Sequence, residues 1–119
     1  MSVQTIAVVP HYKYEVVKQQ TVGTSSAQMT QYSLSDLLSA GVPVLNNIMP
    51  RPDNIFLQAA PGNSGTITVY AGNPAVAGVG KILSAGSNIS LPIRDASKWY
   101  VVASGAGQTL DISYQWGVD

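Results

Sequence analysis

The stretch that decides the fold is "ASKWYVVASGAGQTLDISYQW", residues 96–116. Its second half alternates large apolar with polar side chains, which is the pattern of a strand with one buried face. The apolar positions are Leu110, Ile112, Tyr114 and Trp116. Its first half is apolar at successive positions, as in a central strand or one half-covered by a neighbouring chain. Because glycine supplies the positive φ of a tight reversal, the Ser-Gly-Ala-Gly between the halves predicts a β-hairpin.

Outward from this stretch, the chain consists of short apolar runs separated by Gly, Pro, Asn and Ser. The runs are "YEVVKQQTV" (14–22), "AQMTQY" (27–32), "NIFLQAA" (54–60), "TITVYAG" (66–72) and "KILSAGSNISLPI" (81–93). The Pro-Gly-Asn-Ser-Gly between the third and fourth runs predicts a second hairpin. This spacing predicts an all-β protein: a single antiparallel β-sandwich or a jelly-roll-like barrel of about eight strands.

A single short helix is expected within "SLSDLLSAG", residues 33–41. Ser33 is a suitable N-cap, Asp36 stands at the capping-box position, and Gly41 is a suitable terminator, so the segment predicts about two turns. The following "VPVLNNIMPRPDN" contains Pro50-Arg51-Pro52. Two prolines so close together disfavour a central strand, and we expect this segment to connect two sheets.

The composition restricts the classes of partner. At 119 residues, one domain is expected. Charged residues are only 10% of the chain, and six Lys and Arg balance six Asp and Glu. Such a surface has no excess of cations with which to bind nucleic acid, and it has few charges to resist contact with other subunits. The N-terminal segment is predicted to be neither a signal peptide nor a membrane span, since polar and charged residues interrupt its apolar ones.

The residue types that carry most enzyme chemistry are scarce. His11 is the single histidine, and the chain has no cysteine. A Ser-His-Asp triad, a histidine-rich zinc site and thiolate chemistry are therefore not expected. The six Asp and Glu residues are spread along the chain without a local signature of a catalytic pair. We expect no catalysis, no cofactor and no metal.

The order of segments between residues 21 and 117 resembles a known family. "TVGTSSAQM", "NIFLQAAPGNSGTITVYAG", "GKILSAGSNISLPI" and "KWYVVASGAGQTLDISYQWG" are similar to segments of the small β-sandwich virion proteins of tailed bacteriophages. These include capsid decoration (cement) proteins and head-fibre or tail-adaptor modules. The resemblance implies a non-enzymatic protein, often a trimer, that binds the major capsid protein. It also implies a place on the capsid exterior after synthesis in the host cytoplasm.

Two alternatives to decoration stay open at this stage. One is a head-fibre or tail-adaptor subunit. The other, from a different class, is a carbohydrate-binding module that would stack sugars on Trp99, Tyr100 or Trp116, and it requires at least one exposed aromatic ring.

The interface candidates belong to two regions. Residues 1–14 are interpreted as an N-terminal arm preceding a β-sandwich domain of residues 15–119; the arm could add as a strand to a neighbour's sheet edge, or could be the first strand of its own sheet. The strand around residue 101 is apolar on both faces and offers a second contact surface. The candidates are Val3, Ile6, Val8, His11, Tyr12, Tyr14, Tyr100 and Val102. The N-terminal stretch and the segment 33–52 depart from the simplest family members, so the resemblance does not define the docking mode.

Overall fold

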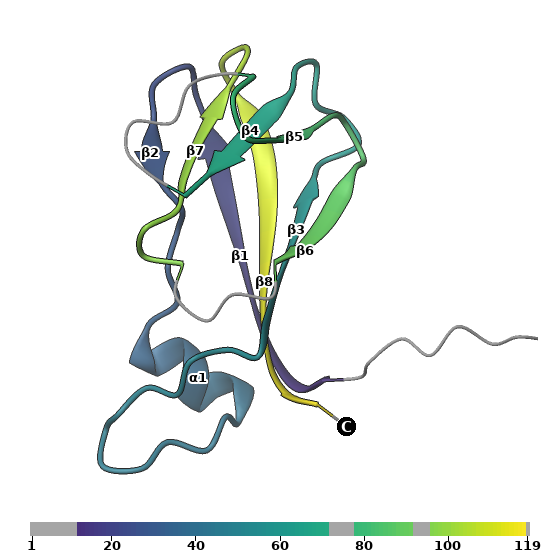
Figure 1. Cartoon of the computed structure of the whole chain (residues 1–119). Helices are drawn as coiled ribbons and strands as arrows, with labels where there is room; N and C mark the ends of the chain where they lie inside the picture. The colour runs from purple at the N-terminus through teal and green to yellow at the C-terminus, as the bar shows by residue number, and fades with distance from the viewer. Residues whose placement is uncertain (1–11, 72–77, 92–95, 119) are drawn as a thin grey trace, which may run out of the picture.

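The computed structural model describes residues 12–71, 78–91 and 96–118, which form two four-stranded antiparallel sheets (Figure 1). Sheet A has the order β1 (Tyr12–Val22), β8 (Gln108–Val118), β3 (Asn54–Ala59) and β6 (Asn88–Leu91). Sheet B has the order β2 (Ala27–Gln28), β7 (Tyr100–Ala103), β4 (Ile67–Tyr70) and β5 (Lys81–Leu83). One helix, α1 (Leu34–Ala40), lies between β2 and β3 in the chain.

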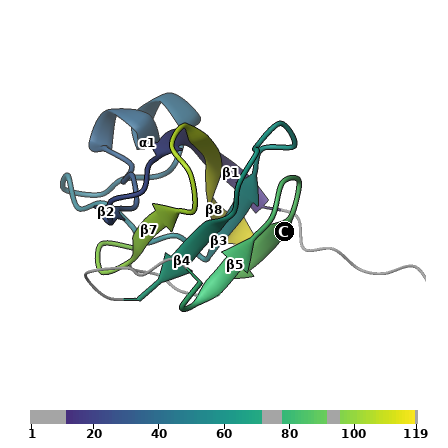
Figure 2. The same ribbon diagram turned by 90° about the horizontal axis from the view of Figure 1, so that it is seen from above.

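The two sheets pack face to face as a sandwich. Figure 2 shows β7, β4 and β5 of sheet B lying across from β1, β8 and β3 of sheet A. The orders β1-β8-β3-β6 and β2-β7-β4-β5 are those of an eight-stranded jelly roll. This confirms the predicted all-β sandwich, with the sheets open rather than closed into a barrel.

Both predicted hairpins are wrong. β8 pairs with β1 and β3, whereas β7 pairs with β2 and β4, so the glycine turn between β7 and β8 carries the chain from sheet B to sheet A. β3 and β4 also lie in different sheets. A tight turn reverses the chain both in a hairpin and in a connection between two sheets. In the connection seen here, the two strands lie on opposite sides of the core, and both bury apolar side chains in it.

A buried glutamine joins the two crossing turns. Gln108 is 2% exposed, and its Oε1 accepts a hydrogen bond from the Gly65 backbone N–H at 2.9 Å. Its Nε2 donates to the Ala106 carbonyl at 3.0 Å and to the Ser64 hydroxyl at 3.2 Å. The side chain thereby satisfies polar groups of both turns at this end of the sandwich, where water does not reach it.

The predicted faces of β8 are confirmed. Leu110, Ile112 and Tyr114 are fully buried, and Trp116 is 4% exposed. They pack in one core with side chains from both sheets, among them Ile55, Leu57, Ile67, Val69 and Val101. The central position predicted for the strand around residue 101 is also confirmed, because β7 lies between β2 and β4.

The predicted helix is confirmed in each part. The Ser33 hydroxyl accepts from the Asp36 backbone N–H, and the Asp36 carboxylate accepts from the Ser33 N–H, which together form the capping box. Gly41 ends the helix at φ 80°, and the Val42 N–H donates to the Leu37 carbonyl at 3.0 Å, as in a Schellman motif. The connection that follows leads from sheet B to sheet A, as the prolines indicate.

The predicted boundary between arm and domain, after residue 14, falls within β1. β1 begins at Tyr12, with Tyr12 opposite Val118 and Tyr14 opposite Trp116. Residues 12–14 therefore belong to sheet A, because β8 is long enough to pair with them. Residues 1–11 lie outside the described part of the chain.

Candidate functional site

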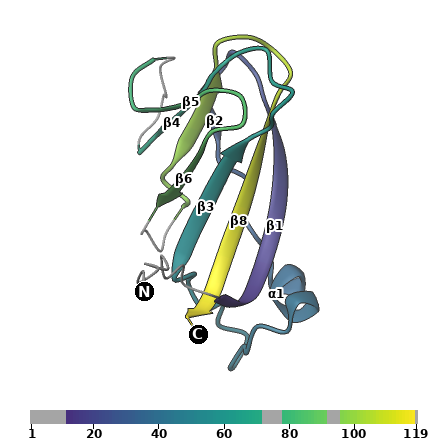
Figure 3. The ribbon, with the colours of Figure 1, turned by 90° about the vertical axis from the view of Figure 1, so that its right-hand side faces the viewer.

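The most prominent exposed apolar surface is the segment 33–52, here called the projection, which extends beyond one end of the sandwich (Figures 1 and 3). It carries four of the eight large hydrophobic side chains that are exposed in the described residues. These are Leu38 at 61%, Leu45 at 77%, Ile48 at 70% and Met49 at 43% exposed. Since exposed apolar side chains gathered in one region mark interaction surfaces, the projection is the candidate site.

A two-residue turn forms the tip of the projection. Leu45 and Ile48 make an antiparallel bridge, and the Ile48 N–H donates to the Leu45 carbonyl at 3.0 Å. Between them, Asn46 and Asn47 have φ values of 55° and 58°. Positive φ at both central residues defines a type I′ turn, and asparagine tolerates this conformation better than most residues. The two amides stand at the apex, with Leu45 and Ile48 on either side.

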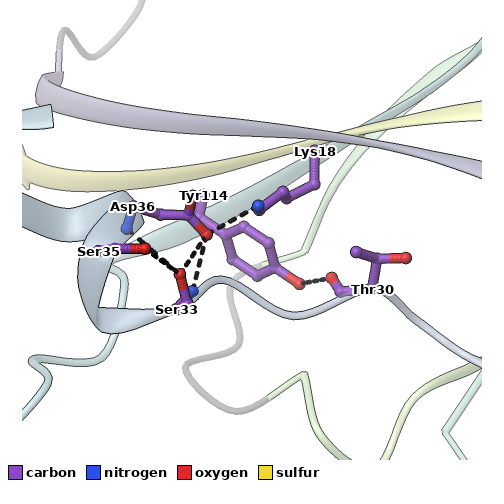
Figure 4. Close-up of polar contacts among 6 residues, drawn as sticks. All are labelled: Lys18, Thr30, Ser33, Ser35, Asp36 and Tyr114. Carbon is purple, nitrogen blue, oxygen red and sulfur yellow. Dashed lines mark hydrogen bonds and ion pairs between the residues drawn. The ribbon is translucent and has the colours of Figure 1, made fainter. Parts of the chain in front are cut away.

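Two aromatic side chains of β8 hold the ends of the projection against the sandwich. The Tyr114 hydroxyl donates to the Thr30 carbonyl, just before the projection (Figure 4). The Trp116 Nε1–H donates to the Pro50 carbonyl at 3.0 Å, near its other end. Tyr32 packs edge-on to both rings, with centroid distances of 4.7 Å to Tyr114 and 5.1 Å to Trp116. Burial raises the pKa of Tyr114, which keeps its hydroxyl protonated as a donor.

The helix end of the projection is held by an ion pair. Lys18 Nζ on β1 lies 2.8 Å from Asp36 Oδ2 (Figure 4). The hydrogen bond from Lys18, and after it the bond from the Ser33 backbone, lower the pKa of Asp36 to about 2. On the helix side facing the sandwich, Leu37 is fully buried and Val42 is 4% exposed, so both belong to the core.

A carboxylate fixes the point where the projection returns to sheet A. The Asp53 backbone N–H donates to the Gln115 carbonyl at 2.8 Å, and its Oδ2 accepts from the Gly117 N–H at 2.7 Å. Contacts with β1, with β8 and with the core therefore hold the projection in place. None of these contacts uses its exposed apolar side chains.

Four of the eight predicted interface residues lie in the described part of the chain, on β1 and β7 rather than in the projection. Val3, Ile6, Val8 and His11 lie outside the described residues. Tyr12 and Tyr14 are half-buried on β1, and the Tyr14 ring packs against the core. A Cβ placed on Gly41 would lie 4.0 Å from the Tyr14 ring, so Tyr14 borders the base of the projection. Tyr100 is half-buried on β7.

Val102 does not provide the surface expected of an interface residue. It is 3% exposed, although its neighbours Val101 and Ala103 are the ones that face the core cluster. Thr68, its partner on β4, is 1% exposed, and the Thr68 hydroxyl accepts from the Gly78 N–H at 3.0 Å. The outward face of sheet B is thus covered within this chain at Val102, so a role for Val102 at an interface stays a prediction.

The four exposed apolar residues of the projection are absent from the predicted interface, although two sequence signals mark three of them. Leu37 and Leu38 are adjacent in a helix of two turns, so they cannot both face one core. "LNNI" places two asparagines between two large aliphatic residues, which is a signal for a two-residue turn.

The aromatic residues considered for sugar stacking are not exposed. Trp116 is 4% exposed and uses its indole N–H within the chain. Trp99 and Tyr100 are half-buried, and Trp99 packs against the core. In the described residues, Tyr70 at 42% is the most exposed aromatic side chain. The stacking surface that the carbohydrate-binding alternative needs is not formed by the three residues predicted for it.

In residues 12–71, 78–91 and 96–118, no group of three or more His, Cys, Asp or Glu side chains is arranged to hold a metal ion. None of the helical structure in those ranges is long and apolar enough to cross a membrane.

Comparison with known proteins assigns no family to this chain. No protein-family model matches the chain, and no curated protein matches it. A solved structure from Bacillus endospore appendages, described as a novel family of disulfide-linked pili, is similar over 98% of this chain and 100% of its own, with 16% identity and a TM-score of 0.43. This chain has no cysteine with which to form a disulfide link.

Proposed function

We propose that this protein is a non-enzymatic structural component of a tailed-bacteriophage virion, and that it decorates the capsid by binding the major capsid protein. The observation that carries the proposal is the projection, whose exposed apolar side chains are held by the Tyr114, Trp116 and Lys18 contacts. Exposed apolar side chains on a segment that is fixed by hydrogen bonds and an ion pair are best explained by a partner protein that covers them. The jelly-roll order is compatible with this role, since viral capsid proteins use it, as do lectins and cupins.

The proposed place of action is the capsid exterior, after synthesis in the host cytoplasm. A subunit that binds the assembled lattice and not its free subunits shifts the equilibrium toward the intact shell. Each site contributes RT ln(1 + [L]/Kd), or about 2.7 kcal/mol when the free protein is at a hundredfold excess over Kd. Because a capsid offers many equivalent sites, small contributions add up to a stabler shell. Self-association as a trimer is part of the same proposal and is measured by sedimentation velocity at micromolar concentration.

The low charge content suggests how attachment responds to salt. With six cationic and six anionic side chains and no net charge, attachment by this chain relies on apolar burial and hydrogen bonds. Ion pairs at an exposed rim weaken as the Debye length shortens, whereas apolar contacts do not. Attachment is therefore expected to persist in washes of about 1 M salt.

The test is to count copies of this protein per major capsid subunit in purified particles by quantitative mass spectrometry. A decoration protein is present in a fixed ratio to the lattice, and its removal lowers survival of heat or osmotic shock. A few copies per particle, with equal survival of bare and complete particles, would indicate a fibre or adaptor subunit instead. Absence from purified particles would refute a virion role altogether.

A further inference from the structure

We propose that the Leu45–Ile48 turn is the docking element of this protein, and that it enters an uncharged protein site with apolar walls and hydrogen-bonding groups at its floor. The proposal rests on the proposed function, in which that site is formed by the major capsid protein. The structure presents the turn at the end of the projection, remote from the β5 end of sheet B (Figure 3).

The chemistry of the turn defines the chemistry of its partner. The segment 41–50 contains no charged residue. Leu45 and Ile48 are 77% and 70% exposed, more than any other large hydrophobic side chains in the described residues. Asn46 and Asn47 lie between them and are also exposed. A complementary site therefore has apolar walls beside the aliphatic side chains and polar groups opposite the amides.

The amides at the apex favour a protein over a lipid surface. A turn that entered the hydrocarbon of a bilayer would bring Asn46 and Asn47 in first. Hydrocarbon offers no hydrogen-bond partner, and leaving an amide unpaired there is costly. A protein site can pair both amides with backbone or side-chain groups. The same segment also lacks the lysines and arginines with which surface-binding segments attract anionic headgroups.

The remaining exposed apolar side chains do not match the turn in shape or setting. Val17 lies on the outward face of sheet A, opposite Ser113 and between Glu15 and Gln19 along β1. On sheet B, Tyr70 and Ile82 lie on β4 and β5, and Val79 lies two residues before β5. These positions lie on or beside sheet surfaces, whereas the turn is a convex element. We therefore assign it to a different protein and not to a second copy of this chain.

The turn is already held in one conformation before it meets a partner. Binding costs free energy when loose side chains and loops become ordered, so an element that is already held in place binds more tightly for the same contact. The turn has its own backbone hydrogen bond at 3.0 Å, and the projection that carries it is anchored at Thr30 and Pro50 by β8. These anchors prepare the turn for docking before the partner arrives.

The experiment rebinds purified protein to particles from which the native copies have been stripped. Wild type is compared with Leu45→Ser/Ile48→Ser, and with the matched control Val17→Ser, which changes an exposed aliphatic side chain elsewhere, 56% exposed. Removing two aliphatic side chains from a docked contact is expected to weaken binding about 100-fold, while Val17→Ser stays within about threefold. Circular dichroism and thermal melting verify that each variant is folded.

A second variant tests the role of the amides. Asn46→Gly/Asn47→Gly keeps the positive φ values that the turn requires and removes both side-chain amides. Docking in a protein site is expected to weaken by about tenfold, since two hydrogen bonds are lost. Insertion in lipid would be unchanged or strengthened by the same substitution. Flotation with vesicles of phosphatidylcholine and phosphatidylglycerol measures this directly.

The outcomes separate the two proposals. If wild type rebinds and Leu45→Ser/Ile48→Ser rebinds equally, the docking element is wrong and the decoration role stands. If wild type does not rebind, both fail. Vesicle binding that depends on Leu45 and Ile48, or a change in sedimentation of the free protein caused by the same substitutions, would assign the turn to a membrane or to a second copy and overturn the proposal.

Discussion

Replacing Tyr114 by phenylalanine removes a single hydroxyl, the one that donates to the Thr30 carbonyl at the start of the projection. The ring itself stays, and with it the edge-on contact to Tyr32 at 4.7 Å and the tilted contact to Trp116 at 6.4 Å. Tyr114 is fully buried, so water does not replace the lost donor. The substitution therefore isolates one hydrogen bond between β8 and the base of the projection.

The expected loss follows from the partner that is left behind. A typical hydrogen bond contributes about 1 kcal/mol net, and because Thr30 is only half-buried, the cost of leaving its carbonyl unpaired is at the lower end of about 1–3 kcal/mol. We expect Tyr114→Phe to lower the free energy of unfolding by about 1–2 kcal/mol. For a domain of this size, each kcal/mol corresponds to roughly 4 °C in Tm.

The assay is equilibrium unfolding in urea, followed by tryptophan fluorescence and by circular dichroism. Tyr70→Phe is the matched control, because Tyr70 is 42% exposed and its hydroxyl is accessible to water. The control is expected to change stability by less than about 0.5 kcal/mol. A loss below 0.5 kcal/mol in Tyr114→Phe, or an equal loss in both variants, would refute the argument that this bond anchors the projection.

Three more predictions concern the helix cap, a strained glycine and the arm. Asp36→Asn is expected to lower the free energy of unfolding at pH 7. The difference in this free energy between wild type and variant closes as pH falls from about 4 to about 2, because the fold lowers the pKa of Asp36 from 3.8 to about 2. Urea titrations across pH measure the difference, and one that persists at pH 2 contradicts the prediction. Gly80→Ala is expected to lower the free energy of unfolding by more than about 2 kcal/mol, since Gly80 has φ +131° and an added Cβ would lie 2.7 Å from the Val69 carbonyl oxygen. Gly62→Ala, whose Cβ would meet nothing within 4 Å, is the control in thermal melts. Equal Tm values for the two variants would contradict the prediction. If residues 1–11 act as an arm, deleting them leaves the circular dichroism spectrum unchanged and weakens binding to particles. A truncated chain that fails to fold would show that these residues belong to its own sheet.

Features that depend on contacts within a few residues could be predicted from the sequence. The cap at Ser33 and Asp36 and the termination at Gly41 involve backbone groups one helical turn away. The alternation in β8 likewise determines which side chains are buried, since successive residues of a strand point to opposite faces whichever strands pair with it. The all-β class follows from the same local periodicity.

Strand pairing depended on tertiary structure. The glycine turn before Gln108 reverses the chain in a hairpin and in a crossing between sheets alike, so the turn residues do not distinguish the two. What decides is the set of partners of β8: paired residues on β1 lie 86 or more positions away in sequence, and those on β3 lie 51 to 61 positions away. The same holds for Val102, which is 3% exposed beside Thr68 of β4, a residue 34 positions away in sequence.

The candidate site also needed the fold. The sequence by itself determined that "LNNI" can form a tight turn, because asparagine tolerates positive φ. Whether Leu45 and Ile48 would face the core or solvent depended on where the chain emerges from the sandwich. That direction comes from Tyr114 and Trp116, whose hydrogen bonds to Thr30 and Pro50 join residues 66 or more positions apart, and no local pattern encodes contacts of that range.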